Sequence, residues 1–193
     1  MTNHEQAIKK AKFADMKFQV GQRVQLILES AGAHKQYTSV IGWVENEFLM
    51  RYQIQEMLRV EKTFEDEGIQ DELDAYNPMV PGGSDFKVTM MIEYPNEADR
   101  RVALAKLVGV EDQIFIEIEG QPRVYAIADE DLERATTEKT SAVHFLRIPL
   151  TPAMKEALKA GAQMMVGCDH KGYPMHVETL PHETLASLVT DLD

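Results

Sequence analysis

Cysteine, positive charge and long apolar runs are all scarce in this chain of 193 residues. The single cysteine, Cys168, excludes a framework of intramolecular disulfides and is typical of a reducing compartment. No apolar run approaches the roughly 20 residues that a membrane-spanning helix needs, and the N-terminus lacks the apolar core of a secretory signal. These absences predict a cytoplasmic protein with no membrane partner.

Acidic residues outnumber basic ones, which gives a formal net charge of -12 and an isoelectric point of about 4.9. Such a charge repels nucleic acids and anionic lipids, so neither is an expected partner. The motifs of common nucleotide-binding and nucleophilic sites are also missing: there is no P-loop, no G-x-G-x-x-G and no G-x-S-x-G. The sequence therefore implies no particular cofactor, and it leaves open whether the protein is an enzyme.

Hydrophobic periodicity predicts both strands and helices. Residues 1–50 form a β-rich N-terminal segment, because residues 17–50 contain runs that alternate between apolar and other side chains. Apolar residues follow at helical spacing in 50–58 and again in 69–76. Hairpins and helices then alternate through the rest of the second domain, residues 51–193. The predicted fold class is α+β, with a largely antiparallel sheet and helices packed on it.

Local signals predict where individual elements begin and end. Asn96 is the predicted N-cap of a helix that ends at Gly109, and Thr151 caps a later helix. The stretches "QIFIEIE" and "RVYAIA" flank "GQP" and predict a hairpin. Residues 129–139, "DEDLERATTEK", predict a short helix with acids in its first turn. A last hairpin is predicted across Lys171–Pro174.

Four long stretches resemble a bacterial family known only as a domain of unknown function. They are "RYQIQEMLRVE", "ELDAYNPMVP", "RVYAIADEDLER" and "EKTSAVHFLR", in that order. The resemblance runs from Arg51 to the C-terminus, about three-quarters of the chain. Genes of this family tend to lie beside those for rubrerythrin-like and iron–sulfur proteins. The resemblance thus implies an accessory role in redox or peroxide defence, with a protein partner from such a system.

The preceding stretch, residues 16–50, is similar to the N-terminal β-module of flagellar brake proteins, which precedes a PilZ domain that binds cyclic di-GMP. A PilZ domain requires closely spaced arginines and a D/N-x-S-x-x-G strand, and this sequence contains neither. We therefore expect no cyclic di-GMP binding. A motility-type adaptor that uses this β-module remains an alternative function.

Polar side chains from several stretches supply the candidate surface for a ligand or partner. The guanidinium of Arg59 suits a bidentate contact with a carboxylate or phosphate. Alternatively, Glu56 and Arg59 form only an exposed pair that adds a few tenths of a kcal/mol to helix stability. The sequence also leaves open whether the chain forms oligomers. The candidate surface comprises Tyr52, Gln55, Glu56, Arg59, Tyr76, Asn77, Glu138, Lys139, His144 and Arg147.

Two members of this surface lie on a predicted strand, residues 141–150. His144 has apolar neighbours on its face of the strand, so a buried ring bonded to a carbonyl is the alternative to a binding role. Arg147 shares the other face with Phe145. If that face is covered, the guanidinium must be paired, and the acids of residues 129–134 are the nearest candidates.

The C-terminal hairpin offers a different site, for a small metal-dependent enzyme. If Lys171–Pro174 form a four-residue loop, Asp169 lies opposite His176 across the hairpin. Asp169, His170 and His176 could together hold a metal ion. Alternatively, a histidine could act as a general base that Asp169 orients. A purely structural hairpin is the competing interpretation.

An acidic stripe is predicted on the second helix, the one that contains residues 69–76, and is formed by Glu67, Asp71 and Asp74. Clustered carboxylates could bind a divalent cation, whereas an exposed stripe normally faces water. A ferritin-like di-iron site is not expected, because no histidine in the sequence has a glutamate three positions before it.

Overall fold

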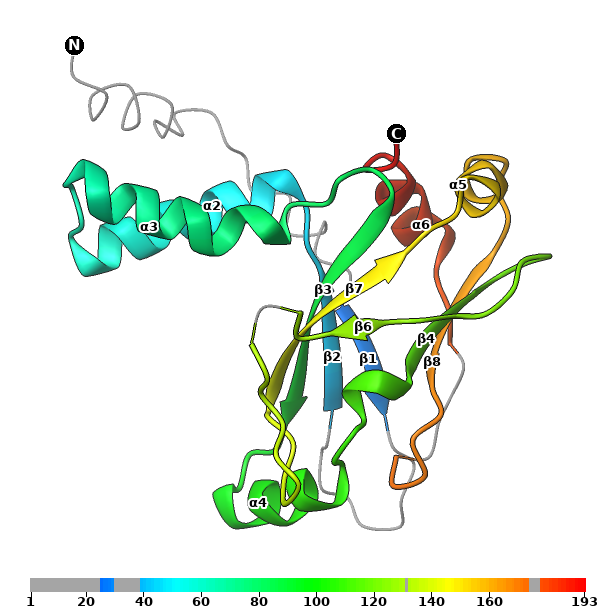
Figure 1. Cartoon of the computed structure of the whole chain (residues 1–193). Coiled ribbons are helices and arrows are strands. Elements are labelled where there is room, and N and C mark those ends of the chain that lie inside the picture. Colours follow the sequence, from blue (N-terminus) through cyan, green and yellow to red (C-terminus); the bar gives the residue numbers. More distant parts are fainter. Residues whose placement is uncertain (1–24, 30–38, 131, 174–177) are drawn as a thin grey trace.

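The structure is a computed structural model that describes residues 25–29, 39–130, 132–173 and 178–193. All described strand pairs are antiparallel, and the strands form two sheets with helices placed around them (Figure 1). The predicted α+β class with a largely antiparallel sheet is therefore confirmed. No helix in the described part of the chain is long and apolar enough to cross a membrane.

One sheet has five strands in the order β1-β2-β3-β7-β6, and the other has four in the order β5-β4-β8-β9. The strands of the first are β1 (Gln25–Glu29), β2 (Ser39–Val44), β3 (Asp85–Glu93), β7 (Val143–Pro149) and β6 (Ile127–Ala128). Those of the second are β5 (Val124–Tyr125), β4 (Ile114–Ile118), β8 (Met164–Cys168) and β9 (Glu178–Thr179). Because β2 pairs with β3, residues before position 50 share a sheet with the rest of the chain.

The two sheets are joined where the chain passes from β5 to β6. The backbone N–H of Ala126 still donates to the carbonyl of Ile114 in β4, at 2.8 Å. Three residues later the N–H of Asp129 donates to the carbonyl of Phe145 in β7, also at 2.8 Å. The hairpin predicted around "GQP" is confirmed by the pairing of β4 with β5. Its continuation into the other sheet was not predicted.

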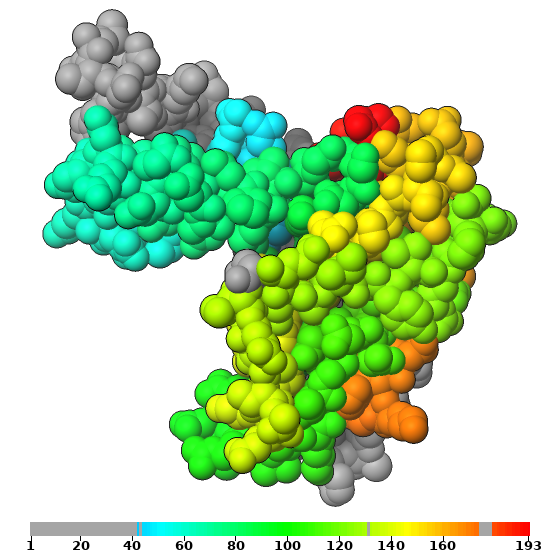
Figure 2. Space-filling model, viewed as in Figure 1, coloured from blue at the N-terminus to red at the C-terminus, as the bar shows by residue number. Residues whose placement is uncertain are grey.

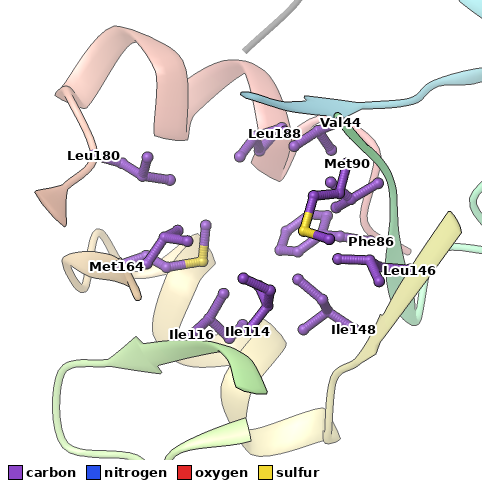
Figure 3. A pocket seen from close by; sticks show the side chains of 13 residues that line it. Val44, Phe86, Met90, Ile114, Ile116, Leu146, Ile148, Met164, Leu180 and Leu188 are labelled. Atoms are coloured by element: carbon purple, nitrogen blue, oxygen red, sulfur yellow. The ribbon is translucent and has the colours of Figure 1, made fainter. Parts of the chain in front are cut away.

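Apolar side chains from both sheets meet in one core. Along β7, His144, Leu146 and Ile148 are buried and the residues that alternate with them are more exposed, the pattern of a strand with one inward face. Leu158 and Leu188 reach the same core from two helices. A cavity of about 40 Å³ remains near its centre, and its described lining consists of apolar side chains and Gly42 (Figure 3).

Three of the described α-helices begin at residues whose side chains accept hydrogen bonds from first-turn N–H groups. Asn96 accepts from Ala98 N and Asp99 N, and Thr151 accepts from Met154 N, so both predicted N-caps are confirmed. The α-helices are α2 (Glu47–Glu61), α3 (Asp66–Tyr76), α4 (Glu97–Lys106), α5 (Pro152–Lys159) and α6 (His182–Val189). The 3₁₀ turns are η1 (Asn77–Met79) and η2 (Glu111–Gln113). The domain boundary predicted at residue 50 falls inside α2.

The predicted helix at residues 129–139 is wrong. The described residues of this segment are neither helix nor strand. Asp129 has a φ of 48°, and its carboxylate is used by His144 and by the backbone of Phe145 rather than by a first helical turn. Thr136 Oγ1 accepts from the N–H groups of Glu138 and Lys139, a local turn that competes with helix formation.

The C-terminal hairpin is present in a different register from the predicted one. Strands β8 and β9 pair Met165 with Thr179. This register is one residue away from that in which Asp169 would oppose His176. A shift of one residue exchanges the faces of a strand, so the predicted facing pair does not follow from the observed pairing. His176 itself lies outside the described residues.

Helices α2 and α3 form an antiparallel hairpin, residues 47–76, which we call the arm. In Figure 1 it extends to the left of the two sheets, and in Figure 2 it stands clear of the body that the sheets and the other helices form. The turn between the helices contains Lys62 in a left-handed conformation, with φ of 56°. Gly68 fits closely against Thr63, where a Cβ would clash with the threonine methyl group.

Candidate functional site

The densest group of polar contacts in the described structure surrounds His144, which is fully buried. Its Nδ1 lies 2.5 Å from Oδ2 of Asp129. Its Nε2 lies 2.8 Å from Oγ1 of Thr140 and 3.2 Å from the carbonyl of Ser141. Thr140 in turn donates to Oε2 of Glu111, at 2.9 Å. A continuous chain of hydrogen bonds thus connects two carboxylates through a threonine and a histidine.

Asp129 is held in place from its other side. Its Oδ1 accepts from the backbone N–H of Phe145 at 3.0 Å and from Arg134 at 3.1 Å. The guanidinium of Arg134 also lies 4.6 Å from the ring centre of Phe145. Asp129, Arg134, Thr140, His144 and Glu111 are referred to below as the buried network.

Every polar side chain of the buried network has a partner within the network. Thr140 has one hydroxyl hydrogen, which it gives to Glu111, so its oxygen accepts from Nε2 of His144. Nδ1 faces the carboxylate of Asp129. The guanidinium of Arg134 faces the same carboxylate, and ionic groups removed from water require such partners.

The contacts of Thr140, His144 and Asp129 have the connectivity of a nucleophile, a base and an orienting acid. The burial of these side chains argues against nucleophilic catalysis. Thr140 is 1% exposed and His144 is 0% exposed, so a substrate cannot reach the hydroxyl. The cavity of Figure 3 provides no route for a polar substrate either, because its described lining is apolar. The network therefore stabilises the fold by joining β7, η2 and the segment before β7.

His144 was predicted either to belong to a binding surface or to be buried against a carbonyl. The structure buries it, and the Ser141 carbonyl is one of its contacts. Its shorter contacts, with Asp129 at 2.5 Å and Thr140 at 2.8 Å, were not predicted. A buried histidine on a strand requires hydrogen-bond partners. Asp129, which follows the neighbouring strand β6, was the signal in the sequence that could have predicted this contact.

Arg147 lies on the opposite face of β7, where it makes a bidentate ion pair with Glu130 at 2.6 and 2.8 Å. The pairing of Arg147 with the acids of residues 129–134 was predicted and is confirmed. This hydrogen bond, followed by the charge of Arg147, holds the pKa of Glu130 below its ordinary value. Lys87 and Asp85 form a second ion pair beside it, on the adjacent strand β3. The four charges balance.

Asp169 and His170, from the predicted metal site, have protein partners. Asp169 accepts from Arg123 at 2.6 Å and from the Tyr125 hydroxyl at 2.5 Å. His170 Nε2 lies 3.1 Å from the carbonyl of Val108, and Gly172 N–H donates to Nδ1 at 3.1 Å. Both ring nitrogens of His170 are thereby engaged. Among the described residues no group of three or more His, Cys, Asp and Glu side chains is arranged to hold a metal ion.

Cys168 precedes this pair and is also buried. Burial raises the pKa of its thiol above the ordinary value. A buried thiol with a raised pKa has little thiolate character, so Cys168 is a core residue rather than a nucleophile.

The remaining predicted surface residues are spread over two regions. Tyr52, Gln55 and Glu56 are half-buried and Arg59 is exposed, all four on α2. Arg59 bonds Glu56 at 2.7 Å, the exposed helix pair that was predicted as the alternative. Arg59 holds the pKa of Glu56 below its ordinary value, first through this hydrogen bond and then through its charge.

The arm separates Arg59 from Asn77. Arg59 is in the last turn of α2, at the far end of the arm, whereas Asn77 follows the last residue of α3, where the arm meets the sheets. The eleven residues of α3 span about 16 Å. A single pocket therefore does not hold both side chains. Glu138 and Lys139 are exposed in the turn closed by Thr136.

The arm contributes little to the core. None of the residues of α3 is buried, and in α2 only Met50 and Ile54 are. Neither belongs to the core cluster of the described structure. Near the tip, Val60 is 61% exposed and Phe64 is 54% exposed. These two residues were not predicted as site residues, because a single apolar residue on a polar helix face gives no signal in the sequence.

The fold and these surfaces define an α+β protein with two antiparallel sheets, a buried ionic network and a helical arm. Residues 38–192 match the family described as "Protein of unknown function (DUF3501)", and the chain belongs to that family. The predicted resemblance to a domain of unknown function is thereby confirmed.

A solved structure is also similar to this chain: the crystal structure of a novel protein of unknown function from Burkholderia pseudomallei K96243. The two are 49% identical in sequence, with a TM-score of 0.77. The alignment covers 98% of this chain and 89% of that chain. No curated protein matches the chain.

Proposed function

We propose that this chain is an accessory protein that binds a partner protein through its arm. The observation that carries the proposal is that thirty residues, 47–76, extend from the body without adding a residue to the described core cluster. An eleven-residue helix with no buried side chain receives little stabilisation from the rest of the fold. Its presence is explained if the arm gains its contacts from another molecule.

The other candidate sites support this choice by their geometry. Thr140, His144 and Glu111 of the buried network are buried, and the described residues of the predicted metal site are engaged within the chain. The arm, in contrast, presents exposed apolar side chains beside charged ones, which is the composition of a protein-binding surface. The resemblance described above suggests a partner from a redox or iron–sulfur system, in the cytoplasm.

Site-specific crosslinking tests the proposal. A photoreactive phenylalanine analogue placed at Val60, near the tip of the arm, should capture the partner in cells of the native host. Val102, on α4, is a matched control because it is also a helical valine and is 56% exposed. The same analogue at Val102 should capture little of that partner.

Binding by purified proteins then provides the decisive comparison. Val60→Asp should weaken binding of the captured partner by about tenfold or more, because it places a charge in an apolar contact. Val102→Asp should change the affinity by less than about twofold. Equal capture from both positions, or equal binding by both variants, would contradict an arm-mediated function.

A further inference from the structure

The two helices of the arm cover each other only in part. Apolar residues recur at helical spacing on both helices. Met57 and Leu58 lie three and four residues after Ile54 on α2, and Ile69 and Leu73 lie four residues apart on α3. Except for Ile54, these residues remain partly exposed although the helices lie side by side. A helix normally buries an apolar stripe at least 100° wide, and one neighbouring helix cannot cover that width. The arm therefore has apolar surface along its seam that a further helix would cover.

Charge surrounds this apolar seam. Residues 47–76 contain nine acidic and three basic side chains, a net charge of -6 and half of the charge of the whole chain. On α3, Asp66 and Glu72 lie about 60° around the helix from Ile69, one on either side, and so flank the seam. Glu67, Asp71 and Asp74 are exposed on the opposite side of α3, as predicted for a solvated stripe. Acidic margins beside apolar positions attract a basic surface and repel an acidic one.

A second copy of the chain is a poor occupant for the same reason. Two arms in contact would bring two charges of -6 together, and like charges across an interface cost several kcal/mol. A basic segment with one apolar face satisfies both features of the arm. An amphipathic helix presents such a face at the spacing that helical neighbours share.

We infer that the arm binds a basic amphipathic helix of the partner protein, which packs along the seam of α2 and α3 as a third helix. This inference rests on the proposed function and specifies the chemistry of the partner. The apolar face of the bound helix covers the seam, and its Lys and Arg residues face the acids on either side. Binding is consequently sensitive to salt, because exposed charges are screened over about 10 Å at 0.1 M ionic strength.

A pair of model peptides tests the recognition directly. The probe is a labelled peptide of about 14 residues, leucine and lysine at helical spacing, and the reference is its scrambled isomer, which has the same charge but no apolar face. Fluorescence anisotropy with the full chain should show the amphipathic peptide binding about tenfold more tightly than the isomer. Equal binding would mean attraction by charge alone and would overturn the inference.

Two variants of equal charge locate the binding surface. The first carries Asp66→Lys and Glu72→Lys beside the seam, and it should bind the amphipathic peptide about tenfold more weakly than the wild type. The control carries two replacements that change the net charge by the same amount at exposed positions elsewhere, Glu119→Lys and Glu133→Lys. The control should lose less than about threefold. Equal losses would show that only the net charge of the protein matters.

The outcome separates this inference from the proposed function. If the crosslinker at Val60 captures a partner, peptide mapping identifies the segment that it touches. A segment with basic residues and apolar residues at helical spacing supports the inference. An acidic or non-helical segment would overturn it while leaving arm-mediated partner binding intact.

Discussion

His144 and its neighbours show how a few residues determine whether the core is stable. Two carboxylates lie within the protein, and each has a cationic or hydroxyl partner in contact. A buried carboxylate that loses such a partner costs more than the hydrogen bond contributed, because the charge stays out of water. The network is therefore most sensitive where one side chain serves two others, and Thr140 is one such residue.

Replacing Thr140 with valine tests this sensitivity. Valine has nearly the same shape, but it removes the hydroxyl that donates to Glu111 and accepts from His144. Thr140→Val should lower the free energy of unfolding by about 2–3 kcal/mol, measured by urea denaturation. Thr137→Val is the control, since Thr137 is exposed in the same segment, and should change stability by less than about 0.5 kcal/mol. Similar values for both variants would contradict the role assigned to the network.

The Glu130–Arg147 pair gives a prediction that depends on pH. The pKa of Glu130 is lowered by the Arg147 hydrogen bond and charge. The pair therefore stabilises the folded state above the ordinary glutamate pKa of about 4.3, and this contribution is lost as the pH falls through the lower folded value. Glu130→Gln should reduce stability at pH 7 by less than about 1 kcal/mol, because the carboxylate is half exposed to screening solvent.

The difference between wild type and Glu130→Gln should disappear under acidic conditions, when Glu130 is protonated in both states. Urea denaturation at several pH values measures this difference. It should also disappear at pH 7 in an Arg147→Met background, which removes the partner of Glu130. A difference that persists in acid or without Arg147 would show that the carboxylate acts through another contact.

At the scale of elements, local chemistry predicted most of the helices and strands. Asn96 and Thr151 mark helix starts because their side chains replace the missing partners of first-turn N–H groups, and that information is local. The two helices of the arm were also predicted, from helical spacing and from Pro78, which follows α3 within η1. These signals depend on a few adjacent residues and are visible in one sequence.

The segment after β6 could not be predicted in the same way. Its acids suit the first turn of a helix, yet Asp129 bonds to His144, which is 15 residues away along the chain. Glu111 and Thr140 are 29 residues apart and meet only because β4 and β7 belong to sheets that share one core. Tertiary contacts of this length override local preference and leave no periodic pattern. The candidate site was therefore only partly predictable, through His144, Arg147 and the polar residues of α2.

At the scale of the whole molecule, the body and the arm have different sources of stability. The body is held by apolar side chains from both sheets and by the buried network, whereas the distal arm is held by its own helix pair. Sequence reasoning placed Arg59, Asn77 and Arg147 on one surface because it had no information on how far α2 extends from the sheets. The arm places its tip away from the body, so the proposed partner binding can be tested separately from folding.

Shortening the arm tests this separation. Replacing residues 57–70 with a four-residue turn removes the tip but keeps Met50 and Ile54, and none of the removed residues is buried. The free energy of unfolding should change by less than about 1 kcal/mol in urea denaturation, because stability changes are small where no buried side chain is lost. Leu158→Ala, which truncates a side chain that is 2% exposed, should cost about 2–5 kcal/mol in the same assay.

The shortened chain should also fail to bind the partner captured at Val60, although its body is intact. The denaturant slope should fall slightly relative to the wild type, because less surface is exposed on unfolding. A stability loss as large as that of Leu158→Ala would mean that the distal arm is part of the cooperative core. Retained stability with lost binding follows if the arm serves an external contact, since a segment that adds little to folding is then kept for the surface that it presents.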